Sequence, residues 1–531
     1  MSMFLITAVF FWLVFSLIMF RTFAHVLQVE RYHTDAYLKW AAGGGWLKSY
    51  CPRHYLLLVH GTVPVFIVLA LPKLFLPEEY AYGILAAIAV FLSLDIDRTR
   101  GISKKPFVVT PRIKRLLAAT LIIEAAVLAI GFYLSYHTLA GTSIIIAYFQ
   151  PLFIAAGSIA VSPVEKFIQE GFKKSAVAKL GAKKVIAITG SYGKTGTKEA
   201  IAHLLETSYP VLKTPGSYNT PMGISKIINE RMEPHHEIFI VEMGATRRGD
   251  IKELCGIAKP SIGVITSTGD AHMETFGTPE NIALTKFELA DALPPDGILI
   301  VNGDYEHSRR LIENRPQRVV TYGLETNADY VPMNISCSMH GTVFDLKTPD
   351  GKVEGITTRL LGKLNAVNLA GAFAVGRSIG INAAKLKTSA ATLPQMEHRL
   401  HVIENPGSYL IINDAFNSNP PGAKEAVETL GLFEEYKRIL VTPGIVDLGG
   451  LHEKANFEFG KTAAAHCDIA VLVNERRTAP IKKGLLEGGM NAADIKTFPS
   501  LAKAREFIDG HADEKSVVLF ENDLPDHMEL S

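Results

Sequence analysis

Five long apolar segments lie before residue 163, and no other feature restricts the possible folds of this chain as strongly. A helix needs about 20 apolar residues to cross the hydrocarbon of a bilayer, and within lipid only helices and closed barrels satisfy their backbone. We therefore predict that residues 1–165 form a membrane domain of about five transmembrane helices. The expected helices are Met3–Phe20, Tyr55–Leu76, Tyr80–Ile96, Leu116–Ser135 and Thr142–Ser162.

The charges of the connecting segments predict how these helices are oriented. Basic residues gather between the third and fourth apolar segments, at Arg98, Arg100, Lys104, Lys105, Arg112, Lys114 and Arg115. A second group lies between the first and second segments, at Arg31, Lys39, Lys48 and Arg53. Because basic loops remain cytoplasmic, we expect a multi-pass protein of the cell (inner) membrane, with its N-terminus outside and everything after Ser162 in the cytoplasm. The first segment lacks a small-residue cleavage site, which indicates an anchor and not a cleaved signal peptide.

Two polar side chains interrupt the apolar segments. His60 lies in the second segment and Glu124 in the fourth. A carboxylate at membrane depth is costly, so it indicates either a functional group or a hydrogen bond between helices, and the hydrogen bond is the commoner case.

Beyond residue 163 the composition changes to that of a soluble α/β protein. Short β-branched runs alternate with helical patterns, which predicts a mostly parallel sheet with helices on both faces. The runs are "KVIAITG", "EIFIVEMGA", "SIGVITST", "GILIVNGD" and "RVVTYG", and a second series is "SYLIINDAF", "RILVTPGI", "IAVLVNE" and "SVVLFEND". We place a linker at 166–183, a central domain at 184–393, and a C-terminal domain at 394–531, after a boundary near Pro394.

Charge and cysteine content exclude several classes of protein. The net charge is +1 and no Lys/Arg run occurs, so we expect no nucleic-acid partner. The four cysteines are widely spaced and form no CxxC motif, which argues against a zinc site and against disulfides.

The stretch "VIAITGSYGKTGTKEAIAHLL", Val185–Leu205, reads as strand, glycine turn and helix. Such a turn aims successive backbone N–H groups at one anion, and the helix that follows adds the positive end of its dipole. Lys194 is expected to reach the terminal phosphates of a nucleotide, and the Thr195 hydroxyl to bind Mg²⁺. A full Walker A motif has a glycine where Ile188 stands, so an ordinary glycine turn is the alternative.

A series of motifs then follows in a fixed order. After "TGSYGKTGTKE" come "SYNTPMGI", "VEMGA", "DAHMETFGTPENIALTKFEL", "GKLNAVNLAGAFAVG", "HRL", "NDAFNSNPPGAKEAVETL" and "GIVDLGGLHEKANFEFG". This order resembles the Mur ligase family from Val185 to the end. The last four motifs resemble the branch that adds D-alanyl-D-alanine to a UDP-N-acetylmuramoyl tripeptide. The resemblance implies a P-loop central domain followed by a Rossmann-like C-terminal domain.

The resemblance also implies a reaction and the residues that perform it. In the family, ATP phosphorylates a carboxylate, and an amine attacks the acyl phosphate to form an amide. Lys194, His272 and Lys286 match catalytic positions. Thr195, Glu242, His272 and Lys286 match metal positions, which implies two Mg²⁺ sites. Lys286 is expected to be carbamylated, and only an amine with a lowered pKa reacts in this way.

Further matches predict how nucleotide and substrate are held. The cofactor-binding positions are Gly190, Ser191, Gly193, Lys194, Thr195, Gly196, Thr197, Asn368, Arg399, Asp414 and Asn417, and the substrate positions are Asn219, Thr220 and Asn419. Three residues depart from the family pattern: Leu364 replaces a histidine, Phe416 a tyrosine and Asn413 an aspartate. Because Arg399 and Asp414 belong to a different domain from Lys194, we expect closure of the domains to complete the ATP site.

The predicted function is an ATP-dependent ligase of cell-wall (peptidoglycan) biosynthesis at the membrane. Its expected partners are a UDP- or lipid-linked cell-wall precursor, an amino acid or dipeptide such as D-alanyl-D-alanine, and the lipid bilayer. Apolar segments stand where the family has its uridine-binding N-terminal domain, so we expect the precursor to be presented at the membrane or held by the segment Arg21–Arg53. The alternative for that segment is a simple connecting helix. The alternatives are poly-γ-glutamate or pseudomurein synthesis, a nucleotide-regulated transporter, and a scaffold that binds nucleotide without hydrolysis.

Overall fold

The computed structural model describes residues 2–30, 32–42, 107–134, 146, 149–216, 218–269, 273–325, 327–404, 409–415, 418–446 and 448–522. The chain divides into two compact units, of which the first runs to Glu170 and the second from Gly171 to Leu524. The division falls inside one helix, α8. Each unit is described by itself.

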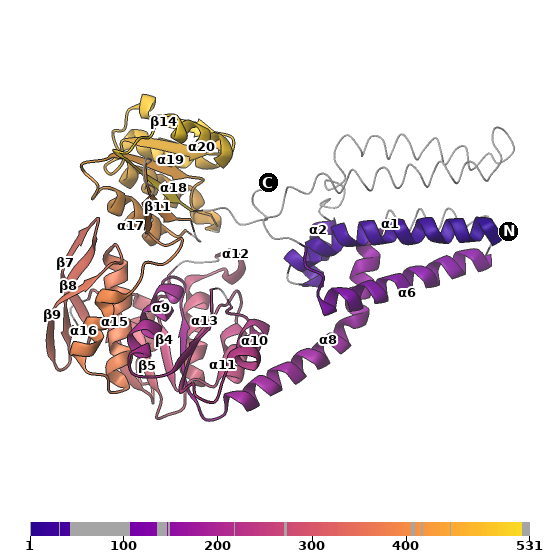
Figure 1. Ribbon diagram of the computed structural model, residues 1–531, viewed down its shortest axis with the longest axis horizontal. Helices are drawn as coiled ribbons and strands as arrows, with labels where there is room; N and C mark the ends of the chain where they lie inside the picture. The colour runs from indigo at the N-terminus through magenta and orange to yellow at the C-terminus, as the bar shows by residue number, and fades with distance from the viewer. Residues whose placement is uncertain are drawn as a thin grey trace. The chain divides into compact units, whose positions relative to one another are not determined.

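The first unit is helical. Its helices are α1 (Ser2–Val29), α2 (Thr34–Ala42), α6 (Pro111–Leu134) and α8 (Gln150–Leu180), drawn in indigo to purple in Figure 1. They bury a cluster that includes Phe23, Leu27, Tyr37, Leu116 and Ile154.

Three of the five apolar segments predicted from the sequence coincide wholly or partly with these helices. The first lies in α1, the fourth is in α6 up to Leu134, and the fifth enters α8 at Gln150. The second and third, with His60, lie outside the described residues. By length and composition, two helices of the described part could cross a bilayer, Pro111–Tyr133 and Gln150–Leu180. The segment predicted as a linker at 166–183 continues α8 to Leu180.

Glu124 of α6 takes part in hydrogen bonds between helices. Its Oε2 accepts a hydrogen bond from Trp12 Nε1 of α1 at 3.1 Å, and its Oε1 accepts one from Gln150 Nε2 of α8 at 2.7 Å. Near the other end of α6, Arg115 pairs with Glu165 of α8 at 2.5 Å. Of the two explanations for Glu124, the structure therefore shows the hydrogen bond between helices.

The second unit begins with a six-stranded parallel sheet. Its order is β2-β3-β1-β4-β5-β6, from β1 (Lys184–Thr189), β2 (Val211–Lys213), β3 (Ile238–Glu242), β4 (Ile262–Ile265), β5 (Ile298–Asn302) and β6 (Arg318–Tyr322). The connecting helices are α9 (Lys194–Glu206), α10 (Pro221–Arg231), α11 (Asp250–Ala258), α12 (Met273–Phe276), α13 (Pro279–Ala292) and α14 (Glu306–Leu311).

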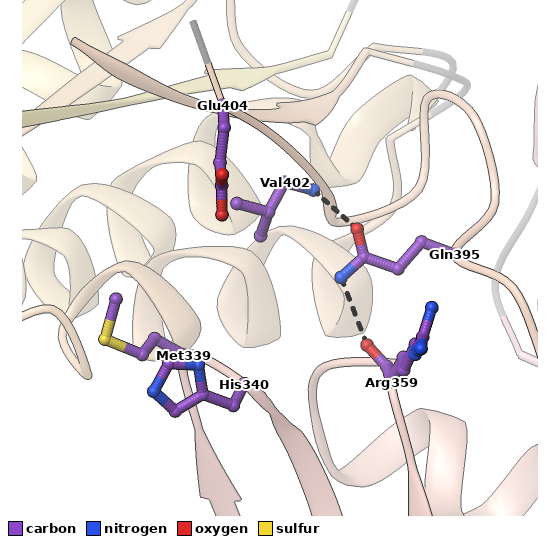
Figure 2. Close-up of a pocket in the computed structure, with 6 residues that line it drawn as sticks. All are labelled: Met339, His340, Arg359, Gln395, Val402 and Glu404. Atoms are coloured by element: carbon purple, nitrogen blue, oxygen red, sulfur yellow. Dashed lines mark hydrogen bonds between the residues drawn. The ribbon is translucent and has the colours of Figure 1, made fainter. Parts of the chain in front are cut away.

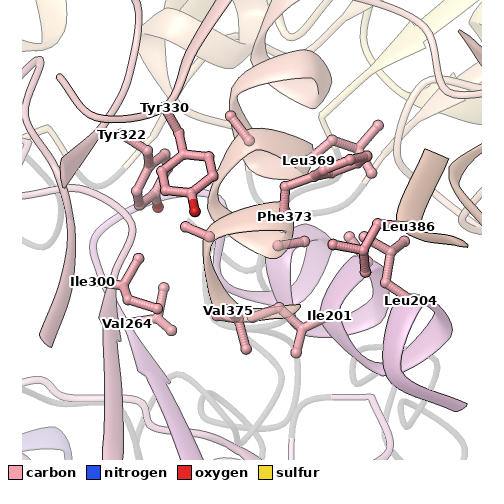
Figure 3. Packing of buried hydrophobic residues seen from close by; sticks show 14 of the residues in the cluster. Ile201, Leu204, Val264, Ile300, Tyr322, Tyr330, Leu369, Phe373, Val375 and Leu386 are labelled. Carbon is pink, nitrogen blue, oxygen red and sulfur yellow. The ribbon is translucent and has the colours of Figure 1, made fainter. Parts of the chain in front are cut away.

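Successive side chains of each strand point to opposite faces of this sheet, and each face buries its apolar side chains against helices. Ile186 and Ile188 of β1 join a core with α9, α15 (Lys363–Ser378) and α16 (Ala383–Thr392). Val185 and Ala187 belong to the other core, with the end of α8, α10, α11 and α13. Figure 3 shows the first core, where Phe373 and Leu369 of α15 lie near Leu204 and Ile201 of α9.

A small antiparallel sheet extends the first core. It contains β7 (Val331–Ser338), β8 (Gly341–Thr348) and β9 (Gly351–Thr358). Phe344, Leu346 and Ile356 are buried on one face, while residues between them point outward. These strands were not predicted, because alternating strands lack the continuous apolar runs by which the parallel strands were recognised.

The last part of the chain forms a second six-stranded sheet in the order β10-β11-β15-β12-β13-β14. The strands are β10 (His401–Ile403), β11 (Leu410–Asp414), β12 (Lys437–Thr442), β13 (Ile469–Val473), β14 (Ile495–Phe498) and β15 (Ser516–Glu521), and only the edge strand β10 is antiparallel. Its α-helices are α17 (Pro420–Leu430), α18 (His452–Ala463), α19 (Glu475–Glu487) and α20 (Leu501–Asp509), with short 3₁₀ turns at Gly449–Leu451 and Ala492–Asp494. The predicted α/β class with mostly parallel sheets is thus confirmed. The predicted boundary near Pro394 lies between the two six-stranded sheets.

Candidate active site

The glycine turn follows β1 and is held from the end of β4. Ser191 N donates to Ser267 O at 3.0 Å, and Tyr192 N donates to Ser267 Oγ at 2.6 Å. Gly193 adopts φ 78° immediately before α9. A Cβ on Gly193 would lie 2.9 Å from Asn368 Oδ1, so both the backbone conformation and the space require glycine here.

We predict that Gly193→Ala destabilises the fold and weakens nucleotide binding. The matched control is Gly181→Ala, because Gly181 also has positive φ, at 57°, but a Cβ there would meet no atom within 4 Å. Gly181→Ala should cost about 1 kcal/mol from the left-handed backbone alone, and Gly193→Ala about 2–3 kcal/mol. Urea denaturation of both variants measures the difference. Equal losses would mean that Asn368 imposes no steric limit on the turn.

Lys194 begins α9 and folds back over the glycine turn. Its Nζ donates to Gly190 O at 2.7 Å and to Ser191 O at 3.2 Å. Burial lowers the pKa of Lys194, an effect that Glu242 opposes and Arg399 reinforces. The ammonium group therefore lies on the turn itself, where a bound anion would relieve its desolvation.

Glu242 ends β3 beside the turn and is 2% exposed. Its Oε2 accepts a hydrogen bond from Thr195 Oγ1 at 2.9 Å, and its Oε1 accepts one from Asn219 Nδ2 at 3.2 Å. Arg399 approaches the same hydroxyl, with Nη2 donating to Thr195 Oγ1 at 3.4 Å. Four residues predicted from separate motifs therefore meet at one place.

Lys198 joins this cluster and was not predicted. Its side chain is fully buried, with Nζ 3.6 Å from Glu242 Oε2 and donating to Gly216 O at 3.1 Å. The signal in the sequence was a lysine on the apolar face of α9, one turn after Lys194. A buried cation needs a partner, and Glu242 supplies one together with Glu199, whose Oε1 lies 3.3 Å from Lys198 Nζ.

Asn368 of α15 lies against the first turn of α9. Its Oδ1 accepts a hydrogen bond from Thr197 Oγ1 at 3.1 Å, and its Nδ2 would lie 3.2 Å from a Cβ on Gly196. Leu364, which stands where the family has a histidine, is partly exposed at the start of α15. Asn365 is the unpredicted neighbour, with Oδ1 accepting from Asn368 Nδ2 at 3.5 Å.

Lys286 lies in the middle of α13 and is 2% exposed. Burial, followed by repulsion from Lys194, lowers the pKa of Lys286 to about 7. Its Nζ lies 5.6 Å from the ring centroid of Phe276. Lys286 is therefore a buried lysine, although its helical sequence pattern also suits a lysine on a solvated surface. His272 lies outside the described residues, and among the described ones no three His, Cys, Asp or Glu side chains form a metal-binding group.

Arg399 and Asp414 lie together on the second sheet's side of the site. Burial raises the pKa of Asp414 to about 6, although the Leu400 N–H, 3.1 Å from Oδ1, and Arg399 both lower it. Burial likewise lowers the pKa of Arg399, and Asp414 opposes that effect. His398 and Leu400, on either side of Arg399, have φ of 60° and 46°, a strained conformation that fixes the direction of the arginine.

The remaining predicted residues have structural partners or are not described. Thr220 Oγ1 accepts from Gly223 N at the start of α10, and Asn419 Oδ1 accepts from Gly422 N at the start of α17. Both are helix N-caps, so their predicted contact with substrate stays a prediction. Asn417 lies outside the described residues.

A pocket of about 410 Å³ lies away from these residues, where the β7–β8 turn and the end of β9 meet β10 (Figure 2). Gln395 crosses it, donating to Arg359 O at 3.1 Å and accepting from Val402 N at 3.2 Å. None of the predicted site residues lines this pocket, whose walls are Met339, His340, Arg359, Gln395, Val402 and Glu404.

A glycine turn between a buried parallel strand and a helix, with a strand-end glutamate facing the helix's first threonine, defines a P-loop α/β protein. Comparison with known families narrows the class. Residues 188–376 match the Mur ligase middle domain, and residues 398–521 match the Mur ligase glutamate ligase domain. The chain belongs to the Mur ligase family.

Named relatives support this assignment. The UDP-N-acetylmuramoyl-tripeptide–D-alanyl-D-alanine ligase of Bacillus subtilis is 35% identical over 289 residues, which are 54% of this chain and 61% of the relative. The enzyme of the same name from Synechocystis is 30% identical over 331 residues, 60% of this chain and 68% of the relative. The chain thus spans about three fifths of the length of the first of these relatives.

A solved structure resembles the second unit. The crystal structure of MurF ligase from Thermotoga maritima in complex with ADP has a TM-score of 0.59 and 27% identity, and the match covers 67% of this chain and 80% of that one.

Proposed function

We propose that this chain is an ATP-dependent ligase that joins an amino compound, of the D-alanyl-D-alanine type, to the carboxylate of a peptidoglycan precursor. The observation that carries the proposal is the meeting of Thr195, Glu242 and Arg399 beside the glycine turn. The names of the relatives and the ADP complex of the Thermotoga maritima protein support the same chemistry.

The proposed reaction needs charge neutralisation and positioning more than covalent chemistry by the protein. A substrate carboxylate oxygen attacks the γ-phosphorus of ATP, and ADP leaves with the electron pair of the broken bond. The amine nitrogen then attacks the acyl carbon, and phosphate leaves as the amine releases a proton to solvent. Lys194 and the backbone N–H groups of residues 193–195 would hold the phosphates, while Arg399 would neutralise charge near Thr195.

The oxygen atoms of Thr195 and Glu242 fit Mg²⁺, because this cation prefers hydroxyl and carboxylate ligands and these two oxygens are 2.9 Å apart. When bound, Mg²⁺ would offset the charge of the phosphates. Lys286 is proposed to carry a carbamate, which would supply an anionic oxygen for a second ion together with His272. Two observations favour this, the burial of Lys286 and the pKa of about 7 that burial produces.

We further propose that the first unit lies in the cell membrane, with the ligase on its cytoplasmic side. Two long apolar helices and the basic segments beside them support this placement. The acceptor is then a UDP- or lipid-linked precursor presented at the membrane surface.

Mass spectrometry of the products tests the proposal. The full chain in detergent would be given ATP, Mg²⁺, UDP-N-acetylmuramoyl tripeptide and D-alanyl-D-alanine. We expect a product heavier than the acceptor by the dipeptide less water, with release of ADP and phosphate that requires the amine. ATP hydrolysis that ignores the amine, with no product from a panel of acceptors and amino acids, would contradict the proposal.

A further inference from the structure

The N-terminus of α15 is capped by a side chain from α17, a helix of the second six-stranded sheet. Glu425 of α17 lies 61 residues away in sequence, and its Oε1 accepts a hydrogen bond from Leu364 N at 2.6 Å. The backbone N–H of Lys363 also acts on the same carboxyl group. These are the first two N–H groups of the helix, which have no partner within it.

The sequence before α15 leaves room for this contact. The N-cap position is Gly362, which has no side chain to accept a hydrogen bond. Gly362 has φ 94°, and a Cβ there would lie 2.6 Å from Glu425 Cδ. Glycine is therefore needed both for the backbone conformation and for the approach of the carboxylate.

The burial of Glu425 makes its contact with α15 significant. Glu425 is 9% exposed, and burial raises its pKa to about 8, while the Leu364 N–H lowers it and the nearby Asp414 raises it further. The oxygens of another buried acid, Glu521, are taken by the Ser418 and Thr442 hydroxyls of its own sheet. The Leu364 N–H is thus the donor to Glu425 across the two sheets, and it offsets only part of the effect of burial on the pKa of Glu425.

The helix that Glu425 caps is the one that contacts the glycine turn. Asn368, one turn after Leu364, bonds Thr197 of α9 and limits the space at Gly193. A shift of the first turn of α15 would therefore move Asn368 relative to Lys194 and Thr195.

We propose that Glu425 is a positioning residue that makes nucleotide binding depend on the contact between the two sheets. Only while α17 lies against α15 is the first turn of α15 capped, and only then is Asn368 fixed against the glycine turn and the first turn of α9. This inference rests on the proposed function. It adds a residue from outside the phosphate-binding motifs, with no direct contact to substrate.

The test is the binding of ADP to the full chain. Binding would be measured by calorimetry with Mg²⁺ for the wild type, Glu425→Ala, Glu425→Gln and Glu428→Ala. Glu428 is the matched control, because it lies on the same helix and pairs with Lys424 at 3.8 Å.

We expect Glu425→Ala to weaken ADP binding by roughly five- to tenfold, the affinity equivalent of a lost helix cap. Glu425→Gln, whose amide oxygen still accepts the N–H, should recover most of the affinity, and Glu428→Ala should match the wild type. Unchanged ADP binding in Glu425→Ala, or no recovery of affinity in Glu425→Gln, would overturn the inference. Failure of the wild type to bind ADP would instead contradict the proposed function.

Discussion

Lys194→Ala is expected to lower kcat/KM for amide formation by about 10²–10³-fold, the range found when a preorganised donor is removed from a transition state. Lys194 Nζ lies on the glycine turn, bonded to Gly190 O and Ser191 O. In the proposed reaction, negative charge develops on the phosphate oxygens that would bind at this turn. Alanine leaves the backbone N–H groups in place, so the variant removes the charge and keeps the shape of the loop.

The measurement is amide product per unit time at saturating and at limiting ATP. Lys226→Ala is the control, because Lys226 lies half exposed on α10, 4.0 Å from Glu230. Circular dichroism would establish that both variants are folded. A folded Lys194→Ala variant with undiminished ligation would mean that the glycine turn has a role other than holding phosphates.

The positions of the strand-end residues could be predicted because parallel strands place their carboxyl ends at one edge. Glu242 follows a continuous apolar run, so its position at the end of β3 followed from the pattern. Its hydrogen bond with Thr195 is what such a sheet requires when the helix after β1 starts at the same edge. The sequence alone was therefore sufficient to predict that Glu242 and Thr195 lie close together.

The contacts between the two sheets could not be predicted in the same way. Glu425 and Leu364 are adjacent only because α17 and α15 pack end to side, and nothing in either segment indicates the other. The same applies to Lys198, whose partner depends on how far the side chain reaches across α9 and β3. Tertiary packing determines which partners such long polar side chains reach.

For Lys286, the helical pattern of the sequence and the resemblance to the family gave different predictions of exposure. The helical pattern of "PENIALTKFELADAL" suits a surface lysine, and only the resemblance to the family indicated otherwise. In the structure Thr285, Lys286 and Phe287 are all buried, since α13 is covered by the sheet and by neighbouring helices. Burial on nearly all sides hides the amphipathic period from which exposure is usually inferred.

Lys286→Met is expected to lower kcat by about 10²–10³-fold, comparable to the loss of another charged group that stabilises a transition state. At pH values above about 7, Lys286 is mainly a neutral amine, which is the form that reacts with carbon dioxide. A carbamate would also replace the repulsion between Lys286 and Lys194 by attraction. Methionine has a similar length and no charge, so the variant fills the same space without an oxygen ligand.

The carbamate itself is observable by ¹³C NMR after incubation with labelled bicarbonate. We expect one carbamate signal in the wild type, also present in Lys226→Met and absent in Lys286→Met. At constant dissolved carbon dioxide it should grow from pH 6 to pH 8, because the amine must lose its proton and carbamate formation releases another.

Burial of the amine without a carbamate also makes stability depend on pH, since the unfolded lysine, with a pKa of 10.5, binds a proton that the folded one resists. Unfolding free energy would then fall as pH drops from 10.5 towards 7, and Lys286→Met would remove that slope. Wild-type activity with no carbamate signal at any pH would leave Lys286 as a buried amine and contradict its proposed role as a metal ligand.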